Sequence, residues 1–254
     1  NNRKLRLRRW LDRNIVFPVA KKAIANSEFG STALITAGMD KDRILVIPNG
    51  IEIRKNVSIK KEDNLPIHLC IVANLLPIKG HAYLLSSLSQ LDKSIDWRLH
   101  IVGDGPEKEN LMILAKKLYI FDRIVFHGYL SNLVPVLNQS DICFLTSLEY
   151  ESCSNAILEY MGNGKPTIAT TASGNPELID NNVNGILVSS KDPNALTKAI
   201  TRLIGSAKLR MKFGENALAK AKKYYAMEVV AKKYKDVYLS VLNQDDECKR
   251  DCVK

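Results

Sequence analysis

The sequence has no long apolar run, no cysteine-dense segment and no Met at position 1. No run approaches the roughly 18 apolar residues of a membrane span, and Arg13 and Asn14 interrupt the stretch that a signal peptide would need. Five cysteines in 254 residues exclude a disulfide scaffold and fit a reducing compartment. A hydrophobic fraction of 46% and a charged fraction of 25% exclude disordered and collagen-like chains. We therefore expect a cytoplasmic globular protein with one large domain or two small ones.

Patterns that bind metals or dinucleotides are also missing. Cys248 and Cys252 share a charged tail, but the two further ligands that a zinc site needs are not nearby. The segment 40–42 has the spacing of a D-x-D metal motif, yet it lies between a predicted helix and a predicted strand, so we interpret it as a surface turn. Lys108 stands where G-x-G-x-x-G would have its last glycine, which argues against a dinucleotide-dependent oxidoreductase. We expect neither a metal nor another cofactor.

The net charge of +10 is concentrated at the two ends of the chain. Residues 1–13 carry a net +5 and residues 208–235 a net +7, which leaves the rest at −2. Residues 3–17 have the pattern of a basic amphipathic helix that Pro18 ends or kinks. Such a helix either lies on an anionic membrane, as in a peripheral protein at the inner membrane face, or is a solvated surface helix. Basic and aromatic residues do not alternate, so we expect no nucleic-acid partner.

From Pro66 onward, apolar runs alternate with helical patterns. The runs predict strands at 67–73, 98–102, 123–127, 141–146, 166–170 and 185–188. The helical patterns predict helices at 80–92, 105–119, 131–139, 153–163, 175–180, 192–204, 206–223 and 226–243. Because the connections are short, this alternation predicts an α/β fold with a Rossmann-like doubly wound parallel sheet.

A shorter α/β piece precedes this region. It comprises a strand at 23–25, a helix that Ser27 begins and Gly38 ends, and a strand at 43–47. Residues 48–50 break that strand, and the polar residues that follow are the best linker in the sequence. We therefore divide the chain into a truncated N-terminal piece, a linker, a ligand-binding domain, and a C-terminal helix with a charged tail, at 1–50, 51–66, 67–225 and 226–254.

A doubly wound sheet binds its ligand at the carboxyl ends of the strands, so the loops there are candidates for a site. The loop 74–80 follows a strand and opens a helix, where free backbone N–H groups bind anions. Lys79 adds a full charge suited to a phosphate, although an exposed lysine before a capping Gly80 gives the same pattern. The loops 103–107 and 170–177 have the composition of turns.

The segment 149–166 is the most informative of these loops. Glu151 lies just before a predicted helix, and Glu159 lies two turns into it. The unpaired N–H groups of residues 153–155 are placed to hold a diphosphate, and Glu159 to accept hydrogen bonds from a ribose diol. We expect Glu151 to touch a second sugar or a developing positive centre. For two isolated glutamates, a capping acid and a solvated acid on a helix face would be the better explanation.

In their order and spacing, these loops resemble the donor-binding half of retaining GT-B glycosyltransferases of family 4. Glu151 and Glu159 match that family's two glutamates separated by seven residues, and its G-K-P follows at 164–166. Its phosphate loop, its V-G-D-G-P-E, its I-P-N-G crossing between domains and its last strand resemble the segments 74–80, 102–107, 47–50 and 184–188. The similarity covers about residues 20–240. Residues 1–50 would then be the end of an N-terminal, acceptor-side domain.

The resemblance implies transfer of a hexosyl group from a UDP- or GDP-sugar with retention of configuration, without a metal, in polysaccharide or glycolipid synthesis. It assigns Glu151 to catalysis, in contact with the donor sugar. The implied donor-binding residues are Asn74 and Lys79 at the diphosphate, Ser154 and Asn155 beside it, Glu159 at the ribose, and Tyr129 and Leu130 at the base. The family commonly has Arg where this chain has Asn74, so one phosphate anchor is weaker here.

The implied acceptor is a glycan or a lipid-linked molecule. A GT-B enzyme has two domains of similar size, yet only about 50 residues precede the linker, and the family's N-terminal histidine has no counterpart. Two expectations follow: a glycosyltransferase, or a non-catalytic or half-enzyme donor-binding module that needs a partner for the acceptor side. We expect the chain alone to bind a nucleotide sugar and to transfer sugar poorly.

Overall fold

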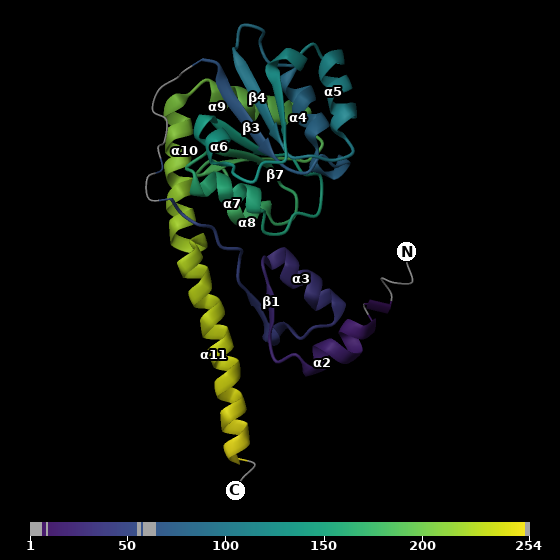
Figure 1. Ribbon diagram of the computed structural model, residues 1–254, viewed down its shortest axis with the longest axis vertical. Coiled ribbons are helices and arrows are strands. Elements are labelled where there is room, and N and C mark those ends of the chain that lie inside the picture. Colours follow the sequence, from purple (N-terminus) through teal and green to yellow (C-terminus); the bar gives the residue numbers. More distant parts are fainter. Residues whose placement is uncertain (1–6, 9, 55–56, 58–64, 252–254) are drawn as a thin grey trace. The chain divides into compact units, whose positions relative to one another are not determined.

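The structure is a computed structural model of the chain (Figure 1). It describes residues 7–8, 10–54, 57 and 65–251, with side chains to residue 243. The start of the predicted basic helix, most of the predicted linker, and the side chains of Cys248 and Cys252 lie outside the described residues. The described residues form two compact units, one within 1–50 and 225–254 and the other within 51–224.

The unit within 51–224 is built on one six-stranded parallel sheet. Its strands are β3 (Ile67–Val72), β4 (Trp97–Val102), β5 (Ile124–Gly128), β6 (Ile142–Leu145), β7 (Thr167–Thr170) and β8 (Gly185–Val188). They lie in the order β5-β4-β3-β6-β7-β8, and each adjacent pair is parallel. Every strand begins and ends within one residue of its predicted bounds, so the predicted doubly wound sheet is confirmed.

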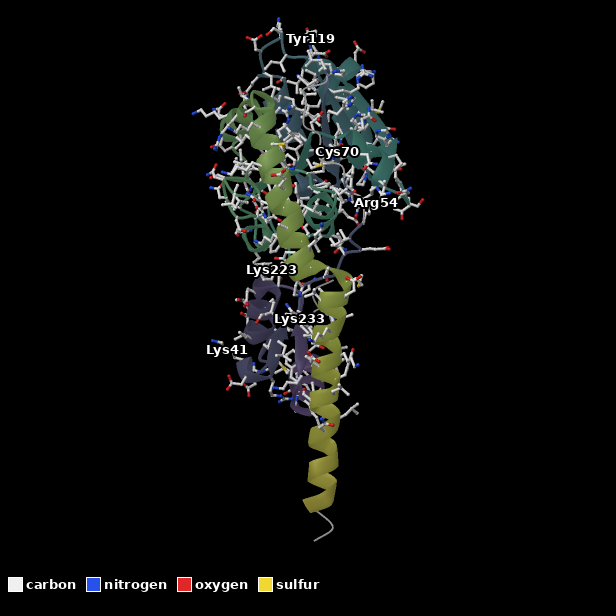
Figure 2. All side chains as sticks on the ribbon, turned by 90° about the vertical axis from the view of Figure 1, so that its left-hand side faces the viewer. Lys41, Arg54, Cys70, Tyr119, Lys223 and Lys233 are labelled. Carbon is white, nitrogen blue, oxygen red and sulfur yellow. The ribbon has the colours of Figure 1, made fainter. Side chains whose placement is uncertain are left out.

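Helices cover both faces of this sheet (Figure 1). One face carries α4 (His81–Leu88), α5 (Lys108–Lys117) and α9 (Pro193–Ile204), whose apolar side chains form the larger core with the strands. The other face carries α6 (Val134–Gln139) and α7 (Asn155–Gly162) over a smaller core that contains Cys70, Cys143 and Tyr160. Cys70 lies inside this unit, whereas Arg54 and Tyr119 are exposed (Figure 2). The helices α8 (Asn175–Leu178) and α10 (Ala207–Lys220) complete the unit.

Several helices differ in length from their predicted ranges. α4 ends at Leu88, because residues 89–94 form turns in which Asp92 Oδ1 accepts from Ser94 N at 2.8 Å. α5 begins only at Lys108, because Gly105 and Pro106 belong to the turn after β4. At both places the apolar pattern of the sequence predicts a helix that is too long. The pattern does not show where a polar side chain or a glycine with positive φ interrupts the helical backbone.

The other unit contains the predicted strands β1 (Ala23–Ala25) and β2 (Ile44–Val46), which pair in parallel around α3 (Glu28–Ala37). Ser27 Oγ caps α3 by accepting from Gly30 N at 2.9 Å, and Gly38 ends it, as predicted. A π-helical turn at Asp12–Val16 leads into α2 (Phe17–Val19). The wider turn accommodates Pro18, which has no N–H to donate, and the helix ends just beyond that proline.

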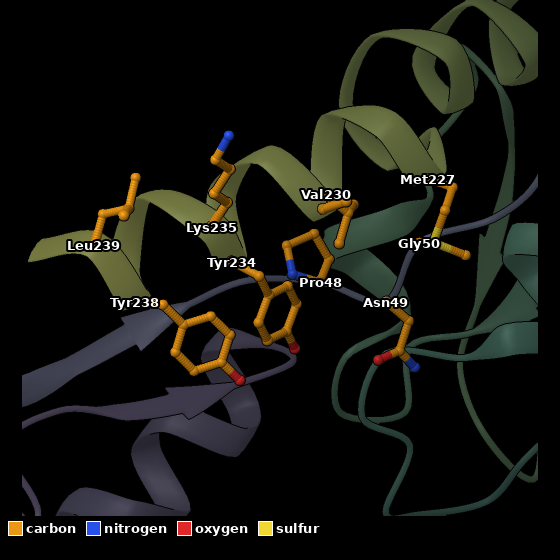
Figure 3. A pocket seen from close by; sticks show the side chains of 10 residues that line it. Pro48, Asn49, Gly50, Met227, Val230, Tyr234, Lys235, Tyr238 and Leu239 are labelled. Atoms are coloured by element: carbon orange, nitrogen blue, oxygen red, sulfur yellow. The ribbon is translucent and has the colours of Figure 1, made fainter. Parts of the chain in front are cut away.

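Residues of this unit also line a hollow of about 610 Å³ between 48–50 and one face of α11 (Met227–Asp251) (Figure 3). Its lining is mainly apolar and aromatic, with Asn49, Lys235 and the hydroxyls of Tyr234 and Tyr238 as its polar groups. The described lining has a single charged residue, so it suits a nucleotide less well than a site with several charged and polar groups would. Asp40 caps a short turn and is exposed, in line with the surface interpretation of 40–42. No described helix combines the length and the apolarity that crossing a bilayer demands.

Candidate functional site

A cleft of about 1060 Å³ opens at the carboxyl ends of the strands of the six-stranded sheet. It lies where the strand order reverses, between β3 and β6, which is where doubly wound sheets bind ligands. The structure brings all the candidate residues together in its lining: Asn74, Lys79, Tyr129, Leu130, Glu151, Ser154, Asn155 and Glu159. Within the described part of the chain, the lining includes no residue of the loop 171–176.

The loop after β3 is fixed against the loop after β6. Gly80 has φ +68°, and a Cβ at this position would lie 2.0 Å from Thr146 O, so only glycine permits this approach. Thr146 Oγ1 donates to Lys79 O at 3.0 Å, and Leu148 N donates to Ile78 O at 2.8 Å. The backbone of Lys79 is therefore held in place, and its ammonium group reaches the cleft from a fixed origin.

The loop 103–107 supports the same segment from the other side. A Cβ on Gly103 would lie 2.1 Å from Ala73 O, which again demands glycine. Leu75 N donates to Asp104 O at 2.9 Å, and Glu107 N donates to Leu75 O at 3.1 Å. This loop forms a turn, as its composition predicted, and its hydrogen bonds to Leu75 hold the neighbouring segment that contains Asn74 and Lys79.

Glu151 is buried, with 7% of its surface exposed, at the base of the cleft. Its Oε1 accepts hydrogen bonds from Lys79 Nζ and from Ser147 Oγ. Its backbone carbonyl accepts from Gly174 N at 2.7 Å, which ties the loop 171–176 to it from behind. Lys79, which we expect at the diphosphate, and Glu151, which we expect at the sugar, thus form an ion pair with each other.

The first turn of α7 borders the cleft, since Ser154, Asn155 and Ala156 all line it. Ser154 is the N-cap of the helix, because its Oγ accepts from Ile157 N at 3.4 Å. This hydroxyl oxygen is therefore already used to cap the helix. The positive end of the helix is directed at any anion bound here.

Glu159 lies further along α7 and is half-buried at the cleft wall. Burial raises the pKa of its carboxyl group above the ordinary value. Among the residues that the structure describes, none donates a hydrogen bond to this carboxylate. A half-buried acceptor without a donor is suited to a ligand that brings hydroxyl groups.

Tyr160 holds the two central strands together where the cleft begins. The paired register of β3 and β6 ends at Ile71 and Phe144. Just beyond, the Tyr160 hydroxyl accepts from Val72 N at 2.7 Å and donates to Phe144 O at 3.2 Å. It thereby replaces the missing ladder contact behind the cleft.

Two buried residues near the site, Lys165 and His81, do not line the cleft. Lys165, of the G-K-P segment, is 3% exposed, and its Nζ donates to Ser140 O at 2.9 Å and Asn138 O at 3.4 Å, at the carboxyl end of α6. There it complements the negative end of the helix. His81 is buried in the first turn of α4, and burial together with the Lys79 charge lowers its pKa to about 4, so its imidazole is neutral.

Sequence reasoning missed several residues of the site, among them Ser147, Glu52 and Arg54. Ser147 is fully buried and binds Glu151, and its position directly after a predicted strand was an available signal. Glu52 and Arg54 line the cleft, although their segment was predicted to be a linker. A cation four residues after the I-P-N-G segment was the available signal for Arg54.

Comparison with known proteins places this geometry in context. The family model described as glycosyl transferases group 1 matches residues 51–220, more than half of the chain. N-acetyl-alpha-D-glucosaminyl L-malate synthase of Bacillus anthracis is 29% identical over 194 residues, covering 76% of this chain and 50% of that protein. The chain thus spans about half the length of this curated relative.

Solved structures of glycosyltransferases share the fold. A glycosyltransferase from Rickettsia africae superposes with a TM-score of 0.82 at 25% identity, covering 92% of this chain and 66% of that one. HepE of Anabaena in complex with UDP gives a TM-score of 0.82 at 24% identity, covering 92% of this chain and 68% of that one. The predicted GT-B type of α/β fold is therefore confirmed.

Proposed function

This chain belongs to the family of glycosyl transferases group 1, and on that premise we propose that its cleft binds a nucleoside-diphosphate sugar. The observation that carries this proposal is the convergence of Lys79, the first turn of α7 and the Glu159 carboxylate in one cleft at the strand-order reversal. A cation and a helix N-terminus suit a diphosphate, and a carboxylate acceptor suits a ribose diol. UDP is the first nucleotide to test, since HepE has been solved with it.

We further propose that the whole protein is a retaining enzyme of family 4 that transfers a hexosyl group to a glycan or lipid-linked acceptor. As the bond between the anomeric carbon of the sugar and the diphosphate oxygen breaks, its electron pair goes to that oxygen. The acceptor hydroxyl oxygen forms the new bond to the anomeric carbon, and its proton passes to the departing diphosphate. Lys79 and the N-terminus of α7 stabilise the charge that grows there. Glu151 contacts the donor sugar, while Tyr129, 81% exposed, and Leu130 offer a surface to the base.

Calorimetric titration tests the donor site through its ribose contact. The unaltered chain should bind UDP roughly tenfold or more tightly than 2′-deoxy-UDP, because a hydrogen bond to a charged group contributes about 1.5–3 kcal/mol. Glu159→Gln should reduce that preference to a few-fold. Glu109→Gln, which removes an acid from α5 away from the cleft, is the control and should preserve it. If neither UDP nor GDP binds the unaltered chain, the proposed donor site is wrong.

The stereochemical proposal needs the whole protein and an accepted substrate. Proton NMR of the first product, recorded before mutarotation, should show the same anomeric configuration as the donor. A product of inverted configuration would refute retention but would not contradict the proposed donor site. Nucleotide-sugar binding with no transfer to any glycan or lipid-linked acceptor would instead favour a donor-binding module that works with a partner.

A further inference from the structure

The cleft contains a cation that is already engaged. Lys79 Nζ pairs with Glu151 Oε1, and the exposed fractions of their side chains are 25% and 9%. Ser147 Oγ donates to the same oxygen. A diphosphate that approaches this site therefore meets a lysine with a buried counter-ion, and not a free ammonium group.

The remaining charges of the cleft do not favour a polyanion. The described lining carries two cations, Lys79 and Arg54, against three acids, Glu52, Glu151 and Glu159. The described part of the lining thus has an excess of one negative charge before any ligand binds. Removing Lys79 from Glu151 would leave that carboxylate buried and close to an incoming anion, which is unfavourable.

The local geometry decides which partner of the pair can move. Glu151 is held at its backbone by Gly174 N and at its carboxylate by Ser147 Oγ. The backbone of Lys79 is fixed as well, but its side chain has four rotatable bonds and is the more exposed of the two. Lys79 can therefore turn toward a phosphate, whereas Glu151 stays.

We propose that Glu151 is the resting counter-ion of Lys79 and makes the cleft favour an intact donor over the spent nucleoside diphosphate. This inference rests on the donor-binding function proposed above. Either ligand draws Lys79 away from Glu151. The sugar hydroxyls of an intact donor then donate hydrogen bonds to the carboxylate and offset the loss. A spent nucleoside diphosphate has no sugar there and carries one more negative charge, so Glu151 promotes its release.

Calorimetric titration of the chain with UDP, UMP and UDP-glucose tests this counter-ion role of Glu151. Glu151→Gln removes the charge at nearly constant shape, and it should raise the affinity for UDP about tenfold. The affinity for UDP-glucose should stay the same or fall, because the glutamine side chain accepts hydrogen bonds from the glucose hydroxyls more weakly than the Glu151 carboxylate does. The affinity for UMP, which has no second phosphate, should change less than twofold. The ratio of the UDP and UDP-glucose dissociation constants is therefore the decisive quantity.

Glu149→Gln is the matched control. It removes an acid two residues away that pairs with Lys191 at 3.7 Å and does not line the cleft, so it should leave the ratio unchanged. An equal rise in UDP affinity in both variants would show a general charge effect and overturn the proposal. Unchanged or weaker UDP binding by a folded Glu151→Gln variant would overturn it too.

A second variant covers the case in which Glu151→Gln does not fold. Ser147→Ala removes the second hydrogen-bond donor to Glu151 Oε1, which leaves this oxygen more strongly paired with Lys79. UDP should then bind a few-fold more weakly, and tighter UDP binding would contradict the counter-ion role. Failure of the unaltered chain to bind either UDP or GDP would instead sink the donor-binding function on which this inference rests.

Discussion

The hydroxyl of Tyr160 is the most sharply testable element of the fold behind the cleft. Tyr160→Phe removes one oxygen from a fully buried side chain and leaves the ring in place. Val72 N then loses its acceptor at 2.7 Å, and Phe144 O loses a donor at 3.2 Å. An unpaired buried backbone N–H costs about 1–3 kcal/mol and the longer bond contributes less, so we expect a loss of about 2 kcal/mol.

Thermal unfolding followed by circular dichroism measures this loss. For a chain of this size, about 2 kcal/mol corresponds to a midpoint lower by about 4–8 °C. Tyr119→Phe removes the same atom from a side chain that is 96% exposed, and it should leave the midpoint unchanged. If the two variants unfold within about 1 °C of each other, the Tyr160 hydroxyl does not bridge the strands, and the argument fails.

Three further predictions concern buried groups near the site. Burial lowers the pKa values of His81 and His100 to about 4, with neighbouring positive charges adding to the effect, so stability is complete above the unfolded pKa of about 6.5 and falls as the pH drops toward 4. The loss should be at most about 3 kcal/mol for His81 and smaller for His100, whose charged form is partly screened by solvent, and urea midpoints at pH 7 and pH 5 check this. Lys165→Met leaves buried carbonyl groups without their donor and should destabilise the chain by about 1–2 kcal/mol in the same urea assay. Gly80→Ala should cost more than about 2 kcal/mol and weaken UDP binding, whereas Gly128→Ala, at the same φ of +68° with nothing within 4 Å, should cost only about 1 kcal/mol.

The sheet was predictable because its signal is local and repeated. Each buried strand is an apolar run between turn residues, and the six strands lie within one residue of those runs. The convergence of the candidate residues on one cleft followed as well, since parallel strands bring their carboxyl ends to one edge. Helix ends were less predictable, because one polar side chain such as Asp92 can replace the last turn.

The contacts inside the cleft were beyond the reach of local patterns. Lys79 and Glu151 are 72 residues apart, so only the folded sheet brings their charges together. Lys165 shows the same limit: the match to G-K-P does not say where its side chain lies, and in the fold the ammonium group turns back to the carboxyl end of α6. Residue type fixes what a group can do, while the packing of distant loops decides which partner it meets.

The positive net charge of the chain is not located at the cleft. The +10 of the sequence lies mainly at 1–13 and 208–235, whereas the described lining of the cleft carries two cations and three acids. Long-range attraction therefore contributes little to holding a polyanionic donor here. For the donor proposed above, recognition therefore rests on short-range groups: the Lys79 ammonium, the N–H groups that open α7, and acceptors for sugar hydroxyls. The proposed nucleotide sugar brings hydroxyl donors for both Glu151 and Glu159, whereas a nucleoside diphosphate brings them for Glu159 alone, and this difference underlies the proposed preference for the intact donor.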